Sequence, residues 1–148
     1  MTEKAPGGNG SGPGPRPAGI TALAVLFAFG TLMSLTASIS LLVPGSVLEP
    51  MWRLNPRARA GFESLGGWAV VLLAVVSVTC SLCAAGFWLG RPWGYRLGFY
   101  GLCVNLLADA ANGILADRRA LVGIPVALAI LAYLRGRRAR SWFGFRYR

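Results

Sequence analysis

The sequence predicts an all-α membrane protein: a polytopic four-helix transmembrane bundle with a short interfacial amphipathic helix between the first two spans. Two long segments without a charged residue carry this prediction, 26 residues from Ala18 to Val43 and 22 from Trp68 to Leu89. A helix needs about 20 mainly apolar residues to cross a bilayer. The composition agrees, because 55% of the 148 residues are hydrophobic and 14% are charged, against about 25% charged in an average globular chain.

The N-terminal segment, residues 1–17, contains five Gly and four Pro and almost no apolar side chain. Such a segment cannot bury enough apolar surface to order itself, so we expect a disordered tail. The following segment, residues 18–43, is the predicted first span. A signal peptide is the alternative, but its apolar region is typically only about 7–15 residues long.

The connection after the first span contains the predicted amphipathic helix. Asn55 is suited to an N-cap, Pro56 to the first helical position and Gly66 to a C-terminal stop. We expect this helix to lie at the membrane interface, and an unstructured loop is the alternative. The side chains expected at the interface are Trp52, Arg53, Arg57 and Arg59.

Three more spans are expected, at residues 68–89, 95–115 and 120–134. The last has only 15 residues, which as a helix cover roughly 22 Å of a core about 30 Å thick. We favour a short span aided by Arg119 and Arg135, whose side chains can reach toward the headgroups, over a re-entrant segment.

The C-terminal tail, residues 135–148, contains six Arg and four aromatic residues. Directly after a membrane helix, it is expected to lie in the cytoplasm on anionic lipid headgroups rather than to bind nucleic acid. Four spans place ten basic residues on the side of both termini and five on the other side. The positive-inside rule therefore predicts that both termini are cytoplasmic, although this count depends on the tail.

A polar face on the third span is the first candidate site. Asn105, Asp109 and Asn112 follow one another at helical spacing, so they share one side of a helix. Polar groups at membrane depth usually face the interior of a bundle or a cavity. Two interpretations stay open: hydrogen-bonded structural contacts between helices, or a polar pocket in which Asp109 takes up a proton.

Cys80 and Cys83 form a C-x-x-C motif inside the second span, which raises membrane thiol redox chemistry. Such chemistry needs a second cysteine pair and access of water to a thiolate, but the chain has only three cysteines. Buried thiols in apolar surroundings are usually inert packing residues.

Small residues predict close packing of the second and third spans across their short turn. Gly86 with Gly90, and Gly94 with Gly98, have the G-x-x-x-G spacing that lets helices approach. Gly101 lies on the same side of the third span as Gly94 and Gly98. The G-x-x-x-G spacing is also common by chance in Gly-rich apolar sequence.

Three runs resemble small bacterial four-helix membrane proteins of unknown function: W-R-L-N-P at 52–56, G-R-P-W-G-Y-R-L at 90–97 and N-L-L-A-D-A-A-N at 105–112. The resemblance implies the fold class and no activity.

Together these features predict a multi-pass protein of a bacterial cytoplasmic membrane. The chain has no His, which excludes imidazole metal sites and His-based catalytic triads, and no cofactor or metal is expected. The first expectation is a non-enzymatic structural or accessory component of a membrane assembly, with a membrane protein as a possible partner. The alternatives are a small-solute or proton pathway along the polar face, and a membrane thiol oxidoreductase.

Overall fold

The computed structural model describes residues 16–115 and 122–145, without the side chains of Leu54, Asn112 and Leu115. Most of the predicted N-terminal tail and the beginning of the predicted fourth span lie outside these residues. The described chain is entirely helical and has no strand, which confirms the all-α prediction. Its elements are α1 (Ala18–Leu42), the 3-10 helix η1 (Glu49–Leu54), α2 (Pro56–Leu65), α3 (Gly67–Trp88), α4 (Pro92–Leu115), α5 (Gly123–Arg135) and α6 (Arg137–Trp142).

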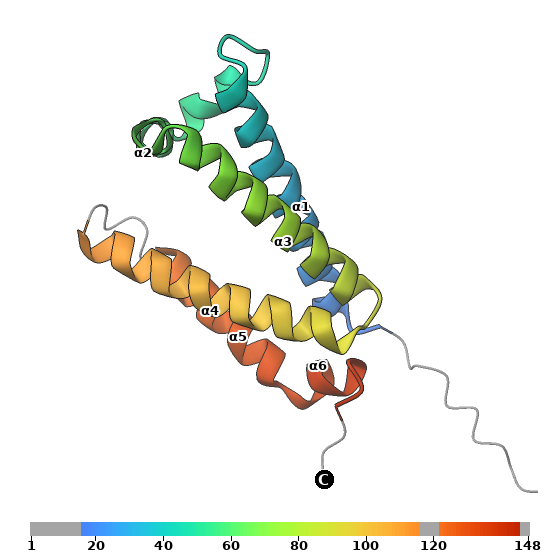
Figure 1. Ribbon diagram of the computed structural model, residues 1–148. Coiled ribbons are helices and arrows are strands. Elements are labelled where there is room, and N and C mark those ends of the chain that lie inside the picture. Colours follow the sequence, from blue (N-terminus) through green and yellow to red (C-terminus); the bar gives the residue numbers. More distant parts are fainter. Residues whose placement is uncertain (1–15, 116–121, 146–148) are drawn as a thin grey trace, which may run out of the picture.

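The four long helices form two antiparallel pairs (Figure 1). α1 lies along α3, and α4 lies along α5. The pairs meet at the short turn between α3 and α4, where α6 also packs, and they diverge toward the end that carries α2. We call the first the turn end and the second the open end of the molecule.

α1 and α3 are each long and apolar enough to cross a membrane. They pack extensively on each other, yet large apolar side chains remain exposed along both, for example Phe29 and Leu32 on α1 and Val75 and Val78 on α3. Neither helix therefore has the single apolar stripe that is typical of a surface helix in a water-soluble protein.

The second helix pair is less uniform. α4 has 24 residues, which cover about 36 Å, but its mean hydropathy is lowered by Arg96, Asn105 and Asp109. α5 has 13 residues, or about 20 Å. The length of α5 is thus shorter than a bilayer core, as the sequence predicts.

The connection between α1 and α3 has the predicted helix signals. The Asn55 side chain accepts a hydrogen bond from the Ala58 backbone N–H at 3.1 Å, and Pro56 begins α2. Gly66 ends the helix with φ +55°, a value that favours glycine. The N-cap predicted at Asn55 is therefore confirmed.

The largest core lies at the turn end. Phe87 of α3, Tyr95 of α4, Leu134 of α5 and Phe143 after α6 meet there with Ile20 of α1. Phe143 is 1% exposed, and its ring centroid lies 5.3 Å from that of Phe87 and 5.3 Å from that of Tyr95. The beginning of the C-terminal tail is thus part of the folded core, which the sequence pattern did not predict.

Candidate functional site

The polar face of α4 contains a hydrogen-bonded pair. The Asn105 side-chain Nδ2 donates to Asp109 Oδ2 at 2.9 Å. Asn105 is exposed and Asp109 is half-buried, because its carboxyl group packs against Gly123 of α5. The side chain of Asn112, like the rim residues Arg118 and Arg119, lies outside the described part of the chain.

The direction of this face explains why Asn105 is exposed. Gly94 and Gly98 lie on the same side of α4 and contact α3 at the turn end. One turn further, a Cβ on Gly101 would meet no atom within 4 Å. α3 has diverged from α4 at that level, so the expected cover by a neighbouring helix stops before Asn105.

The face of α3 that is directed toward α4 offers few hydrogen-bonding groups to Asn105. Val75 precedes Gly86 by as many residues as Asn105 follows Gly94, so the two lie at a similar distance from the contact between the glycines. Val75 is apolar and 59% exposed. The nearby Thr79 hydroxyl already donates to the Val75 carbonyl at 2.8 Å. If α3 and α4 were brought together along their whole length, the Asn105 amide would therefore lie opposite apolar side chains.

The glycines divide into two groups. At the turn end a Cβ on Gly86 or Gly94 would overlap the backbone of the other residue, and a Cβ on Gly98 would overlap the Phe87 ring. Gly90 has φ +63° in the turn, and a Cβ there would lie 3.0 Å from Trp142 Nε1. Gly101, in contrast to the expectation, takes no part in this close approach.

The two cysteines of the C-x-x-C motif lie within the helix pair of α1 and α3. Cys83 is 1% exposed, and Cys80 is half-buried, with its Sγ 3.4 Å from the position of a Cβ on Gly30. Both are free thiols. The side chains pack as small apolar residues, and within the described residues no group of three or more His, Cys, Asp or Glu could hold a metal.

Trp52 has a different position from the one expected of an interfacial anchor. It is only 7% exposed, and its indole Nε1 donates to Ser40 Oγ of α1 at 2.9 Å. Its ring packs edge-on against Phe62 of α2 with centroids 6.0 Å apart. Trp52 is thus the core residue that fixes η1 and α2 to α1, because a buried indole N–H needs an acceptor.

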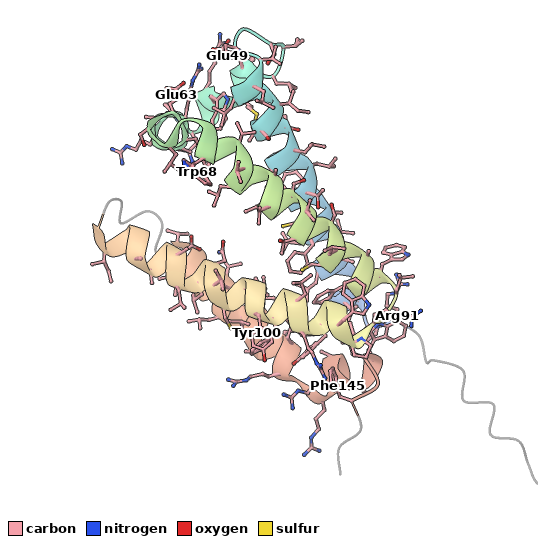
Figure 2. All side chains as sticks on the ribbon, viewed as in Figure 1. Glu49, Glu63, Trp68, Arg91, Tyr100 and Phe145 are labelled. Atoms are coloured by element: carbon pink, nitrogen blue, oxygen red, sulfur yellow. The ribbon has the colours of Figure 1, made fainter. Side chains whose placement is uncertain are left out.

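Glu49 and Glu63 lie at the open end (Figure 2), and both form ion pairs with Arg59. Arg59 contacts Glu63 at 2.6 Å and Glu49 at 2.8 Å. Hydrogen bonds to Glu63 and then Glu49 raise the pKa of Arg59 above its ordinary value. Arg53 and Arg57, which were expected at the interface, are exposed beside this group. Exposed pairs of this kind contribute little to stability.

The turn end carries an arginine-aromatic contact that sequence reasoning missed. Arg16 Nη2 donates to the Trp88 carbonyl at 2.8 Å, and the guanidinium lies 4.3 Å from the Trp88 ring centroid and 5.8 Å from that of Trp142. These residues are far apart in sequence, so no local pattern could have paired them. The available signal was the excess of Arg and Trp around residues 88–93 and 135–142.

No protein-family profile, no curated protein and no solved structure matches the chain.

Proposed function

We propose that this chain is a non-enzymatic multi-pass membrane protein that acts as a structural or accessory component of a membrane assembly. In this proposal α1, α3, α4 and α5 cross a bacterial cytoplasmic membrane, and both termini are cytoplasmic. The observation that carries the accessory role is the exposed Asn105 on an otherwise apolar helix surface.

Insertion in a bilayer is supported by the apolar surface of the helices. Val104 and Leu107 on α4 are 65% and 71% exposed, and similar side chains are exposed on α1 and α3. A water-soluble monomer rarely exposes contiguous apolar surface on this scale. Lipid tails would cover the same surface at no cost in hydration.

The proposed orientation is supported by the distribution of charge over the described residues. Among the described residues, the turn end has no Asp or Glu. Figure 2 shows Arg91 at that end. Its arginines are Arg16, Arg91, Arg96, Arg135, Arg137, Arg138 and Arg140. The open end has three described arginines and two glutamates. A carboxylate-free arginine cluster is typical of the cytoplasmic side, where it also meets anionic headgroups.

The accessory role follows from the chemistry of Asn105. In hydrocarbon, an amide without hydrogen-bond partners is costly, and interhelical hydrogen bonds from Asn are a common means of helix association. The pair with Asp109 uses one amide hydrogen. Asn105 is exposed on α4, which favours a transmembrane partner that supplies hydrogen-bonding groups to the rest of the amide at this depth.

The test is affinity purification of the full chain from native membranes in a mild detergent. We expect a co-purifying membrane protein whose recovery falls about tenfold in Asn105→Leu, the difference expected from one to two interhelical hydrogen bonds. Leu107→Ala, a change of a residue that is 71% exposed on another side of α4, should leave recovery unchanged.

Two results would contradict the proposal. One is release of the protein from membranes by alkaline carbonate, which would exclude an integral position. The other is equal recovery of the partner with the wild type, Asn105→Leu and Leu107→Ala. This result would show that the partner does not bind through the pair of Asn105 and Asp109.

The same pair supports a second candidate, a small-solute or proton pathway along α4. Carboxylates inside a membrane are common elements of proton relays. Proteoliposomes containing the wild type should then show a flux that Asp109→Asn abolishes. Identical flux in the two proteins would exclude a pathway through Asp109.

A further inference from the structure

An apolar groove of about 430 Å³ lies between α1 and α3 at the turn end. Four alanines line it together with larger apolar residues, and the lining residues nearest the turn in sequence are Trp88 and Leu89. Its lining includes Ala24, Ala28, Ala84, Ala85, Trp88 and Leu89. Sites for small ligands commonly have volumes of about 300–1,000 Å³. The groove has the chemistry of an alkyl-chain site, because its lining is almost wholly apolar.

A cation is fixed at one end of this groove. Arg16 lies over the ring of Trp88, which lines the groove, and donates one hydrogen bond to the Trp88 carbonyl. A guanidinium has five N–H donors, so other donors of Arg16 remain for an anion. Arg91, which is exposed, follows Leu89 by two residues in the turn. The ring and the carbonyl hold the Arg16 guanidinium in place before any ligand binds.

From this juxtaposition we propose that the α1–α3 groove binds one anionic phospholipid, with an acyl chain along the alanines and the phosphate at Arg16 and Arg91. Arginine suits this role, because its planar fork matches phosphate oxygens. The absence of any carboxylate among the described residues of the turn end makes the site complementary to a net negative headgroup. The inference rests on the proposed function, since it needs the turn end to lie at a headgroup layer.

A second groove supplies an internal control. It lies between α1 and α5 on another side of α1, has a volume of about 530 Å³, and is lined by Gly19, Ala22, Ala129 and Tyr133 among others. Ala22 and Ala28 are both exposed alanines of α1. Phenylalanine at position 28 fills the proposed lipid groove, whereas phenylalanine at position 22 fills the other one.

The test is native mass spectrometry of the full chain from mixed micelles that contain equal amounts of phosphatidylglycerol and phosphatidylcholine. We expect the wild type to retain one phosphatidylglycerol in preference to phosphatidylcholine. Ala28→Phe and Ala85→Phe, which fill the groove from α1 and from α3, should each lower this retention about tenfold. Ala22→Phe should retain phosphatidylglycerol like the wild type.

The headgroup is tested by a matched pair of charge changes. Arg16→Gln should lower phosphatidylglycerol retention about tenfold and thereby reduce the preference for phosphatidylglycerol over phosphatidylcholine. Arg138→Gln removes the same charge from an exposed position at the same end and should have little effect. Arg16 is half-buried and lies before the first residue of α1, so this pair decides the question even if a groove-filling variant does not fold, as judged by circular dichroism.

Equal retention of the two lipids by the wild type would overturn the inference. So would an equal loss in Ala22→Phe and Ala28→Phe, or in Arg16→Gln and Arg138→Gln. Carbonate extraction of the same membranes separates this failure from failure of the proposed function. A protein that remains integral but shows no phosphatidylglycerol preference refutes the lipid site alone.

Discussion

Gly86 of α3 and Gly94 of α4 touch backbone to backbone, so that a methyl group on either would overlap the other. This contact brings the two helix pairs together at the turn end. Beyond it the helices diverge, and the face of α4 that begins with Gly94 continues to Asn105 without cover from α3. The position of this contact therefore determines which part of the polar face is exposed.

A methyl group at this contact should separate α3 from α4. We expect Gly94→Ala to lower the free energy of unfolding by about 1–3 kcal/mol, the usual cost of overpacking. Gly101→Ala should be neutral or stabilising by up to about 1 kcal/mol, because the site is open and alanine favours a helix. Denaturation by sodium dodecyl sulfate in mixed micelles measures both. Equal stability of Gly94→Ala and Gly101→Ala would show that the contact is absent.

Removing the Phe143 ring should open the core of the turn end. The side chain is 1% exposed and packs against Phe87 and Tyr95, so Phe143→Ala should cost about 3–5 kcal/mol. Tyr100→Ala removes an aromatic ring that is 66% exposed, and it should change stability by less than about 0.5 kcal/mol. The same denaturation measurement applies. A loss as small as that of Tyr100→Ala would place Phe143 outside the core.

The hydrogen bond between Trp52 and Ser40 should appear as a coupling energy. Trp52→Phe and Ser40→Ala each remove one partner of a buried bond, which costs about 1–3 kcal/mol. The double variant should be less destabilised than the sum, with a coupling of about 1 kcal/mol. Trp68→Phe, at a residue 75% exposed, serves as the control. Additive effects of the two changes would mean that the bond does not form.

Thiol reactivity in native membranes should follow burial. Cys83 is 1% exposed, whereas Cys103 is half-buried on α4. A membrane-permeant maleimide should label Cys103 faster than Cys83, and Cys83 should react fully only after denaturation. Rapid labelling of both Cys80 and Cys83 in the folded protein would instead support the thiol oxidoreductase that the C-x-x-C motif suggests.

Local features of the fold could be read from the sequence. The charge-free runs predicted spans at 18–43 and 68–89, and the structure has helices at Ala18–Leu42 and Gly67–Trp88. Asn55 was predicted as an N-cap from its position before Pro56, because capping depends on neighbouring residues only. The third predicted span corresponds to α4. This helix begins at Pro92 and not at the predicted residue 95, since proline is well tolerated in a first helical turn.

Long-range packing could not be read in this way. Phe143 resembles a tail aromatic in sequence, yet it lies in the core because α6 turns back onto α3 and α4. Trp52 resembles an interfacial anchor, yet Ser40 of α1 accepts its indole N–H. Arg16 meets Trp88 across 72 residues. None of these pairs has a signal in local spacing.

The sequence by itself determined the helical class, the apolar runs and the alignment of Asn105 with Asp109, because each depends on composition or on helical period. Only the tertiary structure decided which side of α4 is covered. It placed Gly94 and Gly98 against α3 and left Gly101 and Asn105 without cover. The reason is geometric: two straight helices that touch at one end and diverge cannot cover the same face along its whole length.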